Sequence, residues 1–174
     1  MNQKNRKSSR LNGWDYRWPG TYFITICTHE YRHLFGNIIS GKMILSHAGL
    51  VAHLLWQQIP YHTKNKIWLG SFCIMPNHLH GIIQLNQFHH SNECSAATDK
   101  NSNFRKITPK QNSISTIIRS YKSAVTKTCN QLGYPMQWHN RFYDHIIKDQ
   151  EAFHNIDDYI QNNPQKWSQD KFHS

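Results

Sequence analysis

The sequence predicts an α+β fold, in which an antiparallel sheet has helices on one face and a further helix follows the last strand. Two observations predict it. Four short runs are rich in β-branched and aromatic residues, as strands are. Between and after these runs lie three segments with apolar residues at helical spacing or with helix start and stop signals.

The first strand is expected at 21–27, TYFITIC, where aromatic and β-branched residues alternate with Thr. Ser46 can then cap a helix that is ended by Pro60. The apolar stripe of this helix consists of Ala48, Val51, Leu54, Leu55 and Ile59.

Two further strands are expected at 67–75 and 78–85, IWLGSFCIM and HLHGIIQL. Pro76 and Asn77 join them, and both residues suit a tight turn and exclude a helix. The two strands therefore form a hairpin, with a pair of histidines at the start of its second strand.

A second helix is predicted by the clearest apolar stripe in the chain, formed by Ile114, Ile117, Ile118, Tyr121, Ala124, Val125 and Cys129. A fourth strand follows at 141–147, and Asp149 then caps a last helix that runs to Asn163 and is stopped by Pro164. This order of elements is that of a ferredoxin-like or RRM-like antiparallel sheet with helices on one face, plus a C-terminal helix. The other face of the sheet is expected to stay free for a ligand.

The chain of 174 residues is long enough for one domain with a core, and too short for two comfortable ones. We expect a flexible basic arm at 1–13, a single domain at 14–168 and a tail at 169–174. A long polar loop without periodicity interrupts the domain at 86–112. The basic residues of the arm are Lys4, Arg6, Lys7 and Arg10.

The excess of positive charge favours a polyanionic partner. Lys and Arg number 20 against 10 Asp and Glu, a formal net charge of +10, and nucleic acid is the commonest polyanion for such a protein. The four cysteines are scattered, the basic N-terminus has no apolar segment behind it, and no apolar run approaches membrane-spanning length. These features predict a cytoplasmic, nucleoid-associated protein without a membrane partner.

The motif MPNHLHG at 75–81 contains the first candidate site. Side chains at i and i+2 of a strand share a face, so His78 and His80 are expected side by side, with Leu79 pointing into the core. Two imidazoles on one sheet face can bind a metal together. Two surface histidines without a ligand are the alternative interpretation.

The last helix adds a second candidate. Tyr159 and Asn163 are four residues apart and so share a helix face. On a helix that lies across the histidine pair, they would supply a nucleophile and a third ligand together. On spacing alone, Tyr159 is equally an ordinary half-buried tyrosine beside Ile156.

Four stretches resemble a known family: DYRWPGTYFITICTHEYRHLFG, MPNHLHGII, SYKSAVTK and HNRFYDHIIKDQEAFHNIDDYIQNNPQKW. In this order, they resemble the Y1 transposases of the HUH superfamily, most closely the REP-associated tyrosine transposases. The resemblance implies that His78 and His80 bind a divalent metal, that Tyr159 is the nucleophile and that Asn163 completes the metal site. Insertion-sequence members typically have Gln at the last position, so Asn163 favours the REP-associated group.

The activity implied by the resemblance is that of a transposase, a nickase and strand transferase for single-stranded DNA. It would act at or near hairpins such as REP palindromes, with Mg²⁺ or Mn²⁺ as the metal. Tyr159 would attack the phosphate, leaving a 5′-phosphotyrosine and a free 3′-OH. Two imidazoles and one amide oxygen would suit Mn²⁺ better than Mg²⁺. REP-associated relatives are more often monomeric, so the resemblance favours a monomer over a homodimer for this protein.

The sequence leaves three choices open. Tyrosine has an ordinary pKa of about 10, so Tyr159 needs the metal or a base to take its proton, and the candidate bases are His145, His154 and Lys166. Arg119 and Lys122, off the apolar stripe of their helix, are either phosphate contacts or part of a solvated face. The alternative function is a regulator of the same fold that binds nucleic-acid hairpins without cutting them.

Overall fold

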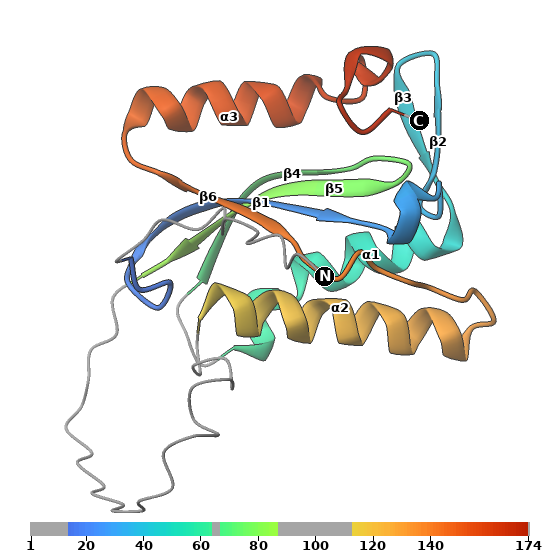
Figure 1. Ribbon diagram of the computed structural model, residues 1–174, viewed down its shortest axis with the longest axis horizontal. Coiled ribbons are helices and arrows are strands. Elements are labelled where there is room, and N and C mark those ends of the chain that lie inside the picture. The colour runs from blue at the N-terminus through green and yellow to red at the C-terminus, as the bar shows by residue number, and fades with distance from the viewer. Residues whose placement is uncertain (1–13, 64–66, 87–112, 174) are drawn as a thin grey trace, which may run out of the picture.

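The computed structural model describes residues 14–63, 67–86 and 113–173. Its centre is a four-stranded sheet in the order β4-β5-β1-β6 (Figure 1). The strands are β1 (Gly20–Cys27), β4 (Ile67–Ile74), β5 (His78–Leu85) and β6 (Tyr143–Ile147). All neighbouring strands are antiparallel. The predicted α+β fold with a ferredoxin-like strand order is therefore confirmed.

Helices lie on both faces of this sheet (Figure 1). The helices α1 (His47–Gln57) and α2 (Ile114–Gln131) pack on one face, and α3 (Gln150–Asn162) lies across the other. The main core lies between the sheet, α1 and α2, and a smaller cluster under α3 is formed by Ile82, Ile147 and Ile160. The face that was expected to stay free for a ligand is therefore partly covered by α3.

Each α-helix begins at a side-chain cap. Ser46, Ser113 and Asp149 accept hydrogen bonds from the backbone N–H three residues later, at 3.1, 3.3 and 2.8 Å. The predicted caps Ser46 and Asp149 are confirmed. The helix α1 ends at Gln57, and Pro60 lies in a short 3₁₀ helix after it, η2 (Ile59–His62). Two more 3₁₀ helices are η1 (His29–Tyr31) and η4 (Trp167–Gln169).

The apolar stripe predicted for α1 is confirmed at Ala48 and Ile59 and is wrong at Leu54. The buried residues of α1 are Ala48, Gly49, Ala52 and Trp56. Leu54 is half exposed, whereas Val51 and Leu55 are partly buried and pack against the main core. Close packing explains the difference, because a Cβ at Gly49 would stand 2.1 Å from the carbonyl oxygen of Phe35. A hydrophobicity pattern does not register residues that are buried because they are small.

The stripe predicted for α2 is confirmed except at Ala124, which is exposed. Tyr121 lies on this stripe and is buried. Its hydroxyl donates to the carbonyl of Ala52 at 2.9 Å. This hydrogen bond joins α2 to α1 beneath the sheet, so Tyr121 has a structural role.

A two-stranded sheet, β2 (Gly36–Ile39) and β3 (Lys42–Leu45), was not predicted. Ser40 and Gly41 form its turn, and both have positive φ, as a tight hairpin requires. Strands of four residues with two exposed isoleucines give only a weak sequence signal. The hairpin lies beside the end of the main sheet where β5 begins (Figure 1).

Two predicted segments fall outside the described residues. They are the basic arm at 1–13, with Lys4, Arg6, Lys7 and Arg10, and the loop at 86–112 apart from Asn86. Among the helices that the structure does describe, none combines the length and the apolar character needed to cross a membrane.

Candidate functional site

Two buried histidines lie side by side on the sheet face that α3 covers. His78 and His80 are separated by one residue on β5, and their ring centroids are 4.5 Å apart. Leu79, between them, belongs to the main core on the opposite face. The predicted alternation is therefore present. The alternative of two surface histidines is wrong, because His78 is 0% exposed and His80 is 1% exposed.

Two buried side chains hold the Nδ1 atoms of these rings. His78 Nδ1 lies 2.8 Å from Asn77 Oδ1, while Asn77 Nδ2 donates to the carbonyl of Phe172 at 2.8 Å. Because the amide nitrogen of Asn77 is committed as a donor, its oxygen accepts the Nδ1–H of His78. Thr25 Oγ1 lies 2.8 Å from His80 Nδ1. When Thr25 Oγ1 accepts the Nδ1–H of His80, the Nε2 atoms of both rings keep a lone pair for a ligand.

Burial keeps both imidazoles neutral near pH 7. It lowers the pKa of His78 to about 4, although the carboxylate of Asp170 acts in the opposite direction. Burial also lowers the pKa of His80 well below its ordinary value, and the charge of His78 acts in the same direction. Metal ligation requires neutral imidazole. The two histidines are therefore in the protonation state that a metal needs.

The helix α3 places Tyr159 over His80. The tyrosine hydroxyl lies 3.2 Å from His80 Nε2, and its ring meets Phe23 edge-on with centroids 6.1 Å apart. Burial raises the pKa of Tyr159 to about 12, the charge of Asp170 adds to the rise, and a hydrogen bond with Asn163 opposes it. The residue is still 40% exposed, so a substrate can approach it from solvent.

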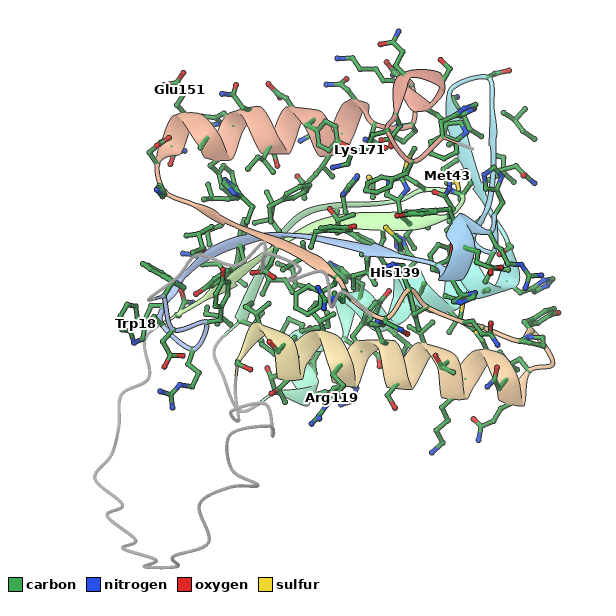
Figure 2. All side chains as sticks on the ribbon, viewed as in Figure 1. Trp18, Met43, Arg119, His139, Glu151 and Lys171 are labelled. Atoms are coloured by element: carbon green, nitrogen blue, oxygen red, sulfur yellow. The ribbon has the colours of Figure 1, made fainter. Side chains whose placement is uncertain are left out.

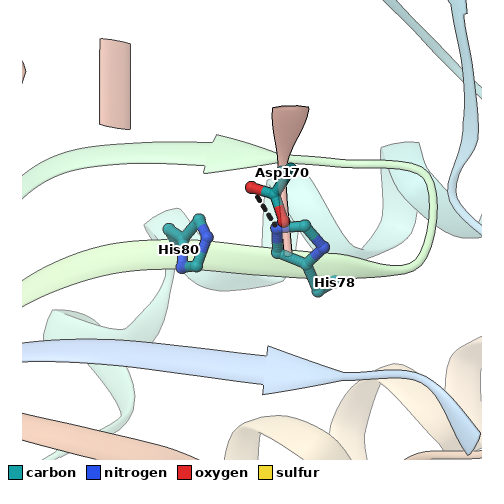
Figure 3. A group of neighbouring side chains, drawn as sticks. All are labelled: His78, His80 and Asp170. Carbon is teal, nitrogen blue, oxygen red and sulfur yellow. Dashed lines mark ion pairs between the residues drawn. The ribbon is translucent and has the colours of Figure 1, made fainter. Parts of the chain in front are cut away.

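Asp170 lies at the centre of the site, in the segment that sequence analysis had set aside as a tail. Its Oδ2 accepts from the Tyr159 hydroxyl at 3.3 Å and from Asn163 Nδ2 at 3.0 Å. The same oxygen lies 4.0 Å from His78 Nε2 (Figure 3). Because His78 is neutral near pH 7, this last contact joins a carboxylate to an uncharged ring. Ligand atoms of His78, His80 and Asp170 all lie within 4.8 Å of one another.

Sequence reasoning missed Asp170 because no spacing connects it to the histidines. Aromatic residues on both sides of it hold it in place. The ring of Trp167 lies 6.0 Å from that of His78, and the ring of Phe172 lies 4.7 Å from it. The N–H of Phe172 also donates to Asp170 Oδ1 at 2.7 Å. Two large aromatic residues in an otherwise polar segment were the signal that could have indicated burial there.

Two buried atoms of the site have no hydrogen-bond partner among the described residues. They are His78 Nε2 and Asn163 Oδ1. A buried polar atom without a partner destabilises a fold, so such atoms need an explanation. Both atoms carry lone pairs, and both belong to residues that contact Asp170. Nitrogen, carboxylate and amide donors gathered in this way fit a divalent cation.

A pocket of about 400 Å³ opens beside the tyrosine. Its lining residues are Phe23, His80, Tyr159, Asn163, Lys166, Gln169, Asp170 and Lys171. Lys166 and Lys171 are exposed, so two positive charges stand at this pocket against the single carboxylate of Asp170. The pocket therefore suits an anionic group with a metal bound near it.

The three predicted bases for Tyr159 have different positions. Lys166 lines the pocket, whereas the ring of His154 contacts the amide of Gln150 at 3.1 Å. His145 is exposed on β6. Besides Asn163, the hydroxyl contacts His80 Nε2 and the carboxylate of Asp170, neither of which was among the predicted bases.

The two predicted phosphate contacts on α2 lie away from this pocket. Arg119 is exposed on α2, across the sheet from Lys171 (Figure 2). Lys122 is half-buried, donates to the carbonyl of His139 at 2.8 Å and lies 5.9 Å from the ring centroid of Trp138. Burial lowers the pKa of Lys122. The structure thus gives Lys122 an intramolecular contact, and DNA binding by either residue stays a prediction.

One comparison by sequence establishes a relationship. No family model matches the chain. A protein of Haemophilus influenzae (strain ATCC 51907 / DSM 11121 / KW20 / Rd), described as an uncharacterized protein, is 34% identical over 169 residues. The matched region makes up 97% of this chain and 93% of that protein. The chain belongs to the same family as this protein.

Among solved structures, the chain is similar to the REP-associated tyrosine transposase bound to a REP hairpin. The TM-score is 0.59 and the sequence identity 18%, over 98% of this chain and 77% of the solved one. The resemblance to the REP-associated tyrosine transposases is therefore confirmed at the level of the fold.

Proposed function

We propose that the protein is a metal-dependent endonuclease and strand transferase for single-stranded DNA, a transposase of the REP-associated tyrosine kind. The observation that carries the proposal is the convergence of Tyr159, His80 and Asp170 at one pocket. They combine an accessible hydroxyl with a cation site, and they come from three separate segments. A protein that only bound hairpins would have no use for this combination.

In this proposal, His78 and His80 bind a divalent metal through Nε2, and Asp170 and Asn163 supply oxygen ligands. The two atoms without a hydrogen-bond partner, His78 Nε2 and Asn163 Oδ1, support this assignment. A set of two imidazoles and two oxygens suits Mn²⁺ better than Mg²⁺, which prefers oxygen ligands. When bound, the metal would act as a Lewis acid toward the scissile phosphate.

Tyr159 is the nucleophile of the proposed reaction. Its oxygen attacks phosphorus, the bond between phosphorus and the 3′ oxygen breaks, and that oxygen takes a proton to become a 3′-OH. The hydroxyl already donates a hydrogen bond to Asp170, which offers its proton a path away from the tyrosine. The resulting 5′-phosphotyrosine is an ester, so a second 3′-OH can attack it and join two strands without ATP.

Several observations support DNA as the partner. The formal net charge is +10, and Lys166 and Lys171 stand at the pocket beside the nucleophile. The solved transposase with the same fold holds a REP hairpin, which supports a hairpin-forming substrate here. We further expect a monomer, and sedimentation of the protein with and without a hairpin oligonucleotide measures this.

Covalent capture tests the proposal. The full chain is incubated with labelled single-stranded oligonucleotides that contain palindromes, in Mn²⁺, Mg²⁺ or EDTA, and the products are separated on a denaturing gel. We expect a detergent-resistant protein–DNA band that needs metal and disappears in Tyr159→Phe. The matched control is Tyr61→Phe, since Tyr61 is 85% exposed and lies outside the pocket. Hairpin binding without a band in either metal would contradict cleavage and favour the non-cutting regulator.

A further inference from the structure

Part of the sheet face that carries the histidines is open at β6. The helix α3 packs mainly on β4 and β5. On the edge strand β6, Ile147 belongs to the cluster under α3. Tyr143 is 45% exposed and His145 is exposed. The register pairs Tyr143 with Thr25, and Thr25 in turn with His80. Because directly paired residues share a sheet face, Tyr143 stands in the same row of side chains as His80.

This exposed strand is continuous with the pocket. His145 pairs with Phe23 in the register, and Phe23 lines the pocket together with Tyr159. The ring of Phe23 also stacks on that of His80, with centroids 5.2 Å apart. A DNA strand that leaves the pocket over Phe23 therefore passes directly onto the face of β6 that carries Tyr143 and His145.

Aromatic rings and positive charge occur together along this path. The ring centroid of Tyr143 lies 6.5 Å from that of Phe172, on which Tyr31 stacks at 5.8 Å. The Lys171 ammonium lies 4.8 Å from the Phe172 ring centroid, and Arg141 is exposed just before β6. Of these rings, that of Tyr143 is exposed, whereas Phe172 is buried. An exposed ring near cations can bind an unpaired nucleotide, because a base can stack while its phosphate contacts the charge.

We propose that Tyr143 and His145 form the surface that binds the unpaired nucleotides next to the scissile phosphate. This inference rests on the proposed function and extends it to the path of the strand. A base stacks on Tyr143, and Lys171 and Arg141 contact the neighbouring phosphates. The occupant is single-stranded DNA, because paired bases in a duplex present no free face to a tyrosine ring.

Affinity for an unpaired oligonucleotide tests the inference. Fluorescence anisotropy is measured in a Tyr159→Phe background, so that no covalent product forms. Tyr143→Ala should weaken binding by about tenfold or more, since stacking on one aromatic residue contributes roughly that much. Tyr143→Phe keeps the ring and should bind as the background protein does. Tyr61→Ala, at a remote exposed tyrosine, should leave affinity unchanged.

Photocrosslinking provides a second measurement that does not depend on a substitution. An oligonucleotide with 5-iodouracil next to the cleavage position should crosslink to the peptide that contains Tyr143 and His145. Unchanged affinity in Tyr143→Ala, with crosslinks elsewhere, would overturn the inference even if the wild-type chain forms the covalent band. Loss of affinity in Tyr143→Ala without any covalent band would sustain β6 as a surface for unpaired DNA, and it would reject the proposed cleavage. No binding of unpaired DNA by the wild-type chain would overturn both.

Discussion

The two sides of the candidate site are built in different ways. The histidine side lies within the sheet, where His78 and His80 are buried and hydrogen-bonded to Asn77 and Thr25. The other side is added from α3 and the residues after it, and its nucleophile candidate, Tyr159, is 40% exposed. The groups proposed to hold a metal are thus fixed by the core, whereas the group proposed to attack DNA stands at the surface.

The largest effect should come from removing a buried imidazole. His80→Ala deletes a proposed ligand. Loss of a residue that only hydrogen-bonds to a ligand lowers metal affinity by up to roughly 100-fold, so Mn²⁺ affinity should fall by more than that in His80→Ala. Isothermal titration calorimetry of the purified chain measures this affinity. His62→Ala, at an exposed histidine of η2, serves as the matched control. Equal Mn²⁺ affinity in the two variants would remove the histidine pair from the metal site.

Acid should destabilise the metal-free protein through the same residues. The pKa of His78 is about 4 in the fold against 6.5 in an unfolded chain. Between these values the unfolded chain binds a proton that the folded chain does not, so stability is full above pH 6.5 and falls as the pH drops. His78 alone accounts for a loss of about 3 kcal/mol at pH 4.

Urea unfolding between pH 7 and pH 4, with a chelator present, measures that loss. His78→Gln removes the titrating group and should flatten the pH dependence of the free energy of unfolding over this range. His62→Gln should keep the wild-type slope, since His62 is exposed. Parallel curves for wild type and His78→Gln would show that burial does not hold His78 neutral.

The hydrogen bonds that hold the two imidazoles should have a smaller effect on metal affinity. Asn77→Ala and Thr25→Val each free one imidazole to rotate, and partners of this kind typically change metal affinity by about 10 to 100-fold. Thr25→Ser keeps the oxygen and should retain the affinity. Long-range ¹H–¹⁵N spectra of the metal-free chain should show His78 protonated at Nδ1. Protonation at Nε2 instead would contradict the role given to Asn77.

The smallest change is expected at Asp170. Asp170→Asn preserves the shape but removes the charge, so Mn²⁺ affinity should fall by about tenfold while the two imidazoles continue to bind. Asp157→Asn, on α3, is the charge-matched control, since Asp157 accepts a hydrogen bond from Gln161 and does not line the pocket. Equal metal affinity in the two variants would leave Asp170 as a hydrogen-bond acceptor only.

Local patterns predicted most of the fold. Residues of β5 were assigned to the correct faces because strand alternation is a local property, and the α2 stripe was recognised because its isoleucines are both large and apolar. Gly49 and Ala52 on the buried side of α1 were missed because such small residues are buried by close packing. Gly81, in the histidine motif, is a related case, since a Cβ there would stand 2.3 Å from Trp56 Cζ2.

The sequence indicated the histidine pair, Tyr159 and Asn163, but not Asp170. The spacing of His78 and His80 identified that pair, and the family resemblance indicated Tyr159. Asp170 reaches them through tertiary packing, in which Phe172 covers His78, and no spacing rule could bring a residue from the end of the chain to β5. The hydrogen bond between Thr25 and His80 likewise depends on strand register.

Mapping the covalent product tests the central claim most directly. The wild-type chain is incubated with a palindromic single-stranded oligonucleotide and Mn²⁺, then digested with nuclease and protease and analysed by tandem mass spectrometry. We expect a 5′-phosphonucleotide on the peptide containing Tyr159, at the tyrosine itself. A nucleotide attached to any other residue, or cleaved DNA without an attached nucleotide, would contradict it.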